Sequence, residues 1–202
     1  MNIEQTSAII LAGGHSSRMG TDKAKLRVGE KTLLEVMVEK VRRLGICEVV
    51  VSGCSECPAG TRYVQDLIPD RGPLSGIHAG LKQIRSRSGL VLPVDMPLIP
   101  EETLKLLIES HGSLPITALT LDDRPEPLVA VYDACLAQDC EKILQQEKTS
   151  PRRLFDMYGY RPVPYIKDAD LLINCNTPEE FALVQKSALF EDQRSHSFNP
   201  KR

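Results

Sequence analysis

Two cationic side chains, Arg18 and Lys23, follow a pair of glycines near the start of the chain. The glycines, Gly13 and Gly14, come just after a short apolar run from Ala8 to Leu11. Because glycine has no Cβ, its backbone N–H groups can approach an anion closely. The guanidinium and ammonium groups can then close over the same anion. This pattern predicts a polyphosphate site, with a nucleoside triphosphate as the first candidate.

The glycine pair does not fit the two common phosphate-binding loops. A P-loop requires a second glycine at the position where Arg18 or Met19 stands, and a dinucleotide fingerprint requires a glycine at His15. A glycine-rich turn with a solvated basic flank remains the alternative interpretation of this stretch when it is taken alone.

Asp95 is the carboxylate with the most informative position. It follows the apolar run Leu90 to Val94 and precedes Met96 and Pro97, which turn the chain. Mg²⁺ prefers one or two carboxylates together with phosphate oxygens and water, so this position is suited to a metal ligand. The alternative is a turn aspartate that accepts hydrogen bonds from its own backbone.

Five motifs in order resemble those of the molybdenum cofactor guanylyltransferase family. The first is Leu-Ala-Gly-Gly-x-Ser-x-Arg-Met-Gly-x-Asp-Lys, which ends at Lys23, and the similarity extends over about residues 7–186. The later motifs are Gly72-Pro73-Leu74-Ser75-Gly76, Asp95-Met96-Pro97, Pro127-Leu128 and Asn174-Cys175-Asn176-Thr177-Pro178.

The resemblance implies a role for each matching residue. The catalytic residues it implies are Arg18, Lys23 and Asp95, and Asp95 is also the metal ligand. The nucleotide-binding residues it implies are Leu11, Ala12 and Gly13 on the guanine and ribose, Gly14 in the same loop, Lys23 on the phosphates, and Asp66.

Three further positions follow from the resemblance. Ser52 stands where the family often carries Asn, so a shorter hydroxyl has to make that contact. Asn174 and Asn176 lie where the family places its residues near the pterin. For Asn176, ordinary capping of the helix that begins at Pro178 is an equally good interpretation.

The reaction that the resemblance implies is nucleotidyl transfer. The terminal phosphate of molybdopterin attacks the α-phosphorus of GTP, and pyrophosphate leaves, with Mg²⁺ as cofactor. A phosphate monoester is already anionic because its second pKa is about 6. No general base is therefore required, and catalysis depends on alignment and charge neutralisation.

Other functions remain open at this point. One is a related enzyme, either a molybdopterin cytidylyltransferase or a sugar-phosphate nucleotidyltransferase. Another is a non-catalytic nucleotide-binding adaptor for cofactor delivery. The resemblance also suggests other cofactor-biosynthesis proteins and molybdoenzyme apoproteins as partners of the chain.

Composition limits the other classes of function. The 202 residues carry a formal net charge of −2 and are 42% hydrophobic, so we expect neither a nucleic-acid partner nor a membrane span. The first residues lack a signal-peptide pattern, and we expect a cytoplasmic location. Six cysteines are present, and the Cys54-x-x-Cys57 pair has no second ligand pair. Free thiols are therefore expected.

Alternating strands and helices predict an α/β fold, a single three-layer αβα domain with a mostly parallel, Rossmann-like sheet of the nucleotidyltransferase type. We expect the domain to cover residues 1–190, with a disordered tail at 191–202. The predicted strands are Ala8–Leu11, Val49–Val51, Arg62–Gln65, Leu90–Val94, Ile116–Leu121, Leu128–Tyr132, Arg161–Ile166 and Leu171–Ile173. Pro93 suggests an edge position or a bulge for its strand.

The predicted helices separate these strands. Thr32 and Glu35 form a capping-box pattern before a helix that Gly45 ends, and Thr177 and Glu180 repeat it before the last helix. The other helices are expected at His78–Arg87, Pro100–His111, Ala134–Gln146 and Pro151–Tyr158, with a shaped loop at Leu67–Gly76. Ligands bind beyond the carboxyl ends of parallel strands, so Gly13, Ser52, Asp66 and Asp95 should gather at one rim.

Overall fold

The computed structural model describes residues 3–13, 22–166 and 169–186. Its main sheet has seven strands, in the order β5-β4-β1-β6-β8-β7-β9. These strands are β1 (Thr6–Leu11), β4 (Val49–Ser52), β5 (Arg62–Val64), β6 (Ser88–Pro93), β7 (Ile116–Leu121), β8 (Arg124–Asp133) and β9 (Arg161–Pro164). A small second sheet pairs β2 (Arg27–Val28) with β3 (Lys31–Thr32).

The main sheet is mostly parallel. β1 pairs in parallel with β4 and β6, β4 with β5, and β7 with β9, whereas β8 is antiparallel to both of its neighbours. The strands other than β8 therefore point in one direction. The predicted α/β class and the parallel arrangement are confirmed.

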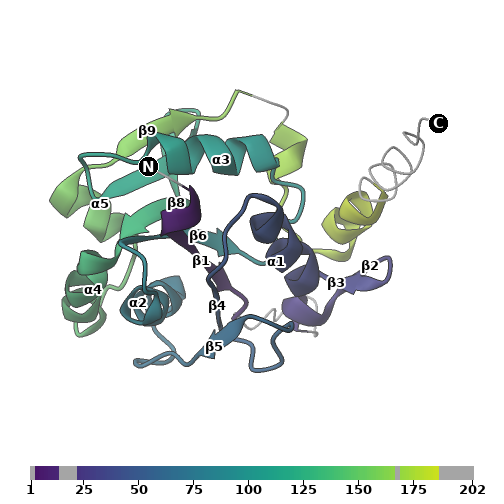
Figure 1. Ribbon diagram of the computed structural model, residues 1–202, viewed down its shortest axis with the longest axis horizontal. Helices are drawn as coiled ribbons and strands as arrows, with labels where there is room; N and C mark the ends of the chain where they lie inside the picture. The colour runs from purple at the N-terminus through teal and green to yellow at the C-terminus, as the bar shows by residue number, and fades with distance from the viewer. Residues whose placement is uncertain (1–2, 14–21, 167–168, 187–202) are drawn as a thin grey trace.

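Helices cover both faces of this sheet, which gives three layers (Figure 1). Helices α1 (Leu33–Arg43) and α3 (Glu101–Ser110) pack on one face, and α2 (Pro73–Gln83), α4 (Ala137–Leu144) and α5 (Arg152–Tyr158) pack on the other. Short 3₁₀ helices occur at η1 (Ile3–Gln5), η2 (Lys23–Lys25), η3 (Ala134–Leu136) and η4 (Ala169–Leu172). Within the described ranges, every helix is too short or too polar to cross a membrane.

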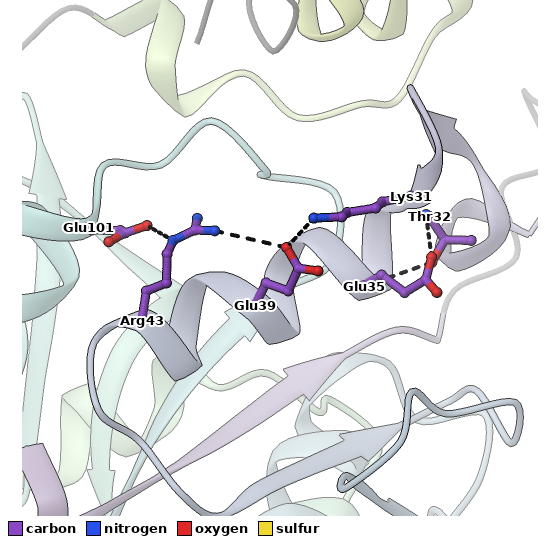
Figure 2. A network of polar contacts seen from close by, with 6 residues as sticks. All are labelled: Lys31, Thr32, Glu35, Glu39, Arg43 and Glu101. Carbon is purple, nitrogen blue, oxygen red and sulfur yellow. Dashed lines mark hydrogen bonds and ion pairs between the residues drawn. The ribbon is translucent and has the colours of Figure 1, made fainter. Parts of the chain in front are cut away.

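Helix α1 begins with the predicted capping box. The Thr32 hydroxyl accepts the Glu35 N–H at 3.2 Å, and the Glu35 carboxylate accepts the Thr32 N–H at 2.7 Å. Figure 2 shows a separate chain of ion pairs beside this cap, along the exposed side of α1. The pairs are Lys31–Glu39 at 2.7 Å, Arg43–Glu39 at 3.9 Å and Arg43–Glu101 at 2.7 Å. Exposed pairs contribute little individually, but the last one links α1 to the first turn of α3.

Helix α2 begins and ends earlier than the sequence predicts. The Pro- and Gly-rich stretch expected as a loop contains its first turn, because Pro73 occupies the first helical position, where no N–H is required. A Cβ on Gly76 would lie 2.8 Å from the Ser52 Oγ, so this glycine lets α2 approach β4 closely. The predicted helical end at Arg87 is wrong, since Ile84 is extended and β6 begins at Ser88.

Pro93 does not lie in an edge strand, because β6 lies between β1 and β8, and the register of β6 with β1 is unbroken up to Pro93. The proline is the last residue of β6 and is paired with Leu11 of β1. The next residue, Val94, donates its N–H to the Leu11 carbonyl at 3.0 Å, so the nitrogen of Pro93 points toward β8. Pairing with β8 ends at Val91 and Ala130, and no hydrogen bond of the ladder is lost.

Two other boundaries differ from the prediction. The charged stretch after Leu121 is a tight turn at Asp122 and Asp123, both with positive φ, and β8 already begins at Arg124. Residues 171–173 do not form a strand, because Leu171 and Leu172 belong to η4.

The capping box at Thr177 is confirmed, and helical residues continue to position 186. The predicted domain end and tail lie outside the described residues.

The cysteines are free thiols, as predicted. Cys54 and Cys57 are not joined by a disulfide, and the Cys57 thiol donates to the Cys54 carbonyl at 3.0 Å. Among the described residues, no group of three His, Cys, Asp or Glu side chains is placed to hold a metal ion.

His78 is a buried titratable group between α2 and α4, with 1% of its surface exposed. Within the part of the chain that the structure describes, neither ring nitrogen has a hydrogen-bond partner, and the Glu141 carboxylate of α4 lies 3.7 Å from Nε2. Burial, and then the charge of Lys82, lower the pKa of His78 below 6.5, whereas Glu141 and Asp66 act in the opposite direction. The ring is therefore neutral in the folded chain at neutral pH.

Replacing His78 by Leu is expected to flatten the pH dependence of stability. Below about pH 6.5, His78 is protonated in the unfolded chain but stays neutral in the folded chain. The free energy of unfolding therefore falls as the pH falls toward the pKa of His78 in the folded state. His78→Leu should remove this decline and raise stability at about pH 7.5 by about 1 kcal/mol, because two unpaired nitrogens disappear. Urea denaturation at about pH 7.5 and about pH 5.5 measures the difference.

Glu141→Gln is the opposing variant, since it removes a charge that raises the pKa of His78, and it should deepen the decline. Equal pH dependence in the wild type and in His78→Leu would contradict this assignment.

Candidate active site

The carboxyl ends of four neighbouring parallel strands form one rim. The β1–β4 ladder pairs Leu11 with Ser52 and is extended by a 2.8 Å hydrogen bond from the Ala12 N–H to the Ser52 carbonyl. On the other side, Leu11 is paired with Pro93, two residues before Asp95. The rim therefore brings together Ser52, Asp95 and the loop that begins at Ala12 after β1, as the sequence predicts. We call the last of these the nucleotide loop, after the ligand that the sequence predicts for it.

The backbones at Gly13 and Gly53 lie in contact. A Cβ on Gly53 would lie 2.2 Å from both the Cα and the N of Gly13, and Gly53 has a φ of +87°. A side chain at this position would have to displace the backbone of the nucleotide loop as well as adopt a strained conformation. The loop after β4 and the loop after β1 are thus positioned by one another.

Ser52 and Asp66 form a polar pair on the side of the rim nearest the β5 edge. The Ser52 hydroxyl donates to the Asp66 Oδ1 at 2.6 Å, and Ser52 is only 3% exposed. The serine at this position therefore orients a partly buried carboxylate. The sequence predicted both residues at the site but not their contact with each other.

Lys23, Asp95 and Asn176 meet at the middle of the rim. The Lys23 ammonium donates to the Asp95 Oδ2 at 2.7 Å and to the Asn176 Oδ1 at 2.5 Å. The side chains of Lys23 and Asp95 are 16% and 18% exposed, so much of this ion pair is withdrawn from water and is screened less than a surface pair. Three segments that are distant in the sequence are joined by one ammonium group.

The backbone that carries Lys23 is capped by Asp22, and the nearby Lys25 makes only an exposed ion pair. Asp22 caps η2 by accepting the Ala24 N–H at 3.0 Å, and the Lys25 ammonium pairs with Glu56 at 2.7 Å. Asp22 therefore fixes the turn from which Lys23 projects. The sequence motif contained Asp22, but nothing in its pattern assigned this role.

The segment around Asn176 is also anchored independently of Lys23. The Cys175 N–H donates to the Asp95 carbonyl at 2.8 Å, and Cys175 is fully buried. Burial, followed by the charge of Asp95, raises the pKa of the Cys175 thiol to about 12, so this thiol stays neutral. Thr177 caps the following helix, which leaves the Asn176 side chain to Lys23. Asn174 lies exposed in the same segment.

Glu126 is a neighbouring carboxylate that the sequence did not single out. Glu126 lies near the start of β8, which runs antiparallel to β6, and it is close enough to Asp95 to be affected by its charge. Burial raises the pKa of Glu126, and the charge of Asp95 adds to this effect. The sequence feature that could have pointed to Glu126 as a site residue is its position directly before the Pro127-Leu128 motif. Glu126 extends the rim on the side away from Ser52 and Asp66.

The donor set fits a magnesium ion held mainly by its substrate. Asp95 is a single carboxylate at a strand end, already oriented toward a cation, and no protein cage surrounds it within the described residues. Mg²⁺ is commonly bound in this way, by one or two carboxylates plus phosphate oxygens. Two predicted members of the site, Gly14 and Arg18, lie outside the described residues.

A parallel sheet whose strand ends carry a glycine loop, a lysine and separate carboxylates defines an α/β nucleotide-binding protein. Comparison with known proteins gives the family. Residues 8–162 match the model of the MobA-like NTP transferase domain. The chain belongs to this family, and the resemblance read from its motifs is confirmed.

Several relatives match over most of their length. The chain is 32% identical to a probable molybdenum cofactor guanylyltransferase of Pelotomaculum thermopropionicum, over 95% of this chain and 96% of that protein. It is 34% identical to the molybdenum cofactor guanylyltransferase of Xanthomonas euvesicatoria pv. vesicatoria, over 87% of this chain and 92% of that protein. The structure of molybdopterin-guanine dinucleotide biosynthesis protein A from Archaeoglobus fulgidus has a TM-score of 0.74 and 25% identity, covering 91% of this chain and 98% of that chain.

Gly53→Ala is expected to weaken nucleoside triphosphate binding by at least about tenfold. The added methyl group displaces the Gly13 backbone, and backbone N–H groups of such loops bind phosphates only when closely placed. Gly29→Ala is the matched control, because Gly29 has a similar φ of +62° but nothing within 4 Å of its added Cβ. Titration with GTP measures both variants. Equal affinities for the two would contradict the role of the Gly13–Gly53 contact.

Proposed function

We propose that the chain is a molybdenum cofactor guanylyltransferase, which transfers GMP from GTP to the terminal phosphate of molybdopterin and releases pyrophosphate. Membership of the NTP transferase family and the names of its relatives support this proposal. The observation that carries it is the meeting of Lys23, Asp95 and Asn176, because it joins the nucleotide loop, the metal carboxylate and the motif matched to the pterin.

We assign the donor nucleotide to the side of the rim formed by β1, β4 and β5. Leu11, Ala12 and Gly13 border the base and ribose, and Gly14 and Arg18 continue the same loop in the sequence. The Asp66 carboxylate, held by Ser52 through one oxygen, offers its other oxygen to the N1–H and N2–H donors of guanine.

We assign the acceptor to the other side of Asp95, where Asn174 and Asn176 follow β9. The Asn176 amide oxygen can accept N–H groups of a pterin ring, and its backbone is already fixed by the cap at Thr177. Asp95 lies between the two assigned sides. This arrangement brings an acceptor phosphate toward the α-phosphate of the donor.

The proposed transfer forms one P–O bond and breaks another. An oxygen of the molybdopterin phosphate attacks the α-phosphorus, and the bond to the bridging oxygen of pyrophosphate breaks. Lys23 and Arg18 place positive charge on the phosphates as negative charge moves to the leaving group. A Mg²⁺ ion held by Asp95 would neutralise phosphate charge and align the reacting groups. The anionic nucleophile requires no proton transfer.

The preferred donor tests this function against its nearest alternatives. Incubation with molybdopterin, Mg²⁺ and GTP, CTP or ATP should give the guanine dinucleotide, identified by mass. We expect kcat/KM for GTP to exceed that for the other two by about 10²-fold or more, because a wrong base leaves polar groups of the site unpaired. A preference for CTP would place the chain with the cytidylyltransferases, and no product with any donor would favour a binding protein.

Asp95→Asn is expected to lower kcat/KM by about 10²-fold or more at limiting Mg²⁺, since an amide is a much weaker ligand than a carboxylate. Asp122→Asn in the β7–β8 turn is the control, because Asn tolerates the same positive φ of 47° there. Steady-state rates at several Mg²⁺ concentrations distinguish the variants. Activity of Asp95→Asn within a few-fold of the wild type would rule out Asp95 as the metal ligand.

A further inference from the structure

The Lys23 ammonium occupies two groups that the proposed function assigns to ligands. Its contacts are the Asp95 Oδ2 at 2.7 Å and the Asn176 Oδ1 at 2.5 Å. Asp95 is the assigned metal ligand, and Asn176 is assigned to the acceptor. The Lys23 side chain therefore links the binding of three ligands, which are the metal ion at Asp95, the acceptor at Asn176 and the triphosphate that Lys23 itself binds.

A metal ion and the ammonium cannot share Asp95 without cost. Mg²⁺ binds carboxylate oxygens at about 2.0–2.1 Å, so it needs a lone pair of the carboxylate and repels any nearby cation. Because only 16% and 18% of the two side chains are exposed, water screens this repulsion weakly. Lys23 has to move away from Asp95 before a divalent cation can bind there tightly.

We propose that Lys23 and the divalent cation compete for Asp95, and that the triphosphate decides the competition by taking the ammonium onto its own oxygens. This inference rests on the proposed function, because it uses the assignment of Asp95 to the metal. The cation alone binds weakly, whereas cation and triphosphate together bind well. Departure of Lys23 also frees the Asn176 amide oxygen, so the donor nucleotide binds before the acceptor.

The surrounding anchors allow this exchange to be made by one side chain. The turn that carries Lys23 is capped by Asp22, which accepts the Ala24 N–H at 3.0 Å, so its backbone does not have to move. The Asp95 carbonyl and the Cys175 N–H keep their hydrogen bond at 2.8 Å without Lys23. The flexible lysine stem therefore swings between two positions while the groups that it leaves stay oriented.

Direct titration with Mn²⁺, followed by the electron paramagnetic resonance of the free ion, tests the competition in the full chain. Lys23→Met and Lys23→Gln should each tighten Mn²⁺ binding by about tenfold, because an opposite charge at this distance changes the affinity of a carboxylate for a cation by about that factor or more. Lys25→Met is the matched control, since it removes the same charge two residues away from an exposed pair with Glu56.

The wild type and Lys25→Met should bind Mn²⁺ with similar affinity. In the double variant Lys23→Met/Asp95→Asn, the increase in Mn²⁺ affinity caused by Lys23→Met should disappear. Thermal unfolding verifies that each variant is folded. Unchanged Mn²⁺ affinity in both folded Lys23 variants would overturn the competition. A gain that persists in Lys23→Met/Asp95→Asn would also overturn it, because the cation would then bind elsewhere.

The order of binding has its own readout. In the wild type, the α,β-methylene analogue of GTP with Mg²⁺ should raise the affinity for molybdopterin by about fivefold or more, and Lys23→Met should lose this coupling. Equal coupling in both proteins would overturn the ordered release of Asn176.

The Mn²⁺ experiment requires no transfer reaction. If the Mn²⁺ titrations give the expected results but no GMP transfer is detected, the proposed function is contradicted and the competition between Lys23 and the cation is still supported. If GMP transfer is normal but the Lys23 variants do not bind Mn²⁺ more tightly, only the competition is contradicted.

Discussion

The parallel register of β1 with its two neighbours is the constraint on which the site depends. Leu11 is paired with Ser52 on one side and with Pro93 on the other, so the chain leaves three adjacent strands at nearly the same level. Parallel strands end at a common edge, and each loop that follows starts beside the others. The nucleotide loop, Ser52 and Asp95 come together for this reason, although they lie far apart in the sequence.

Close packing restricts the part of this rim that lies at the ends of β1 and β4. Gly53 places its backbone against Gly13, and Gly76 lets α2 approach the end of β4. In both places a methyl group would collide with backbone or with a buried side chain. The loops there have few alternative positions, which suits a site whose chemistry requires alignment more than proton transfer.

Electrostatics dominates the centre of the rim. Three carboxylates, Asp66, Asp95 and Glu126, lie along it, and Lys23 is paired with the middle one. Burial raises the pKa of Glu126, and the negative charge of Asp95 raises it further. A rim of this kind favours cations and N–H donors, and an anionic group would need the positive charge of Lys23 or of a cation to approach it. The charge arrangement thus agrees with a substrate that arrives together with a divalent cation.

The sequence by itself determined the α/β class, the order of most elements and the residues at the strand ends. Apolar runs bounded by glycines, two capping boxes and the strand-end positions of Ser52 and Asp95 are local patterns, and local patterns survive in the fold. Predictions from the sequence were wrong where tertiary packing overrides the local conformational preference. Pro93 lies inside the sheet because its nitrogen faces the end of a ladder, and the stretch around Gly76 is helical because α2 presses against β4.

Only the tertiary structure decided which site residues touch. The Ser52–Asp66 hydrogen bond, the contact of Lys23 with Asp95 and Asn176, and the effect of the Asp95 charge on Glu126 all join distant segments. No spacing along the chain encodes such contacts, because they follow from strand order and register, which are set by long-range packing. The sequence supplied the groups that do the chemistry, and the sheet decided which of them meet.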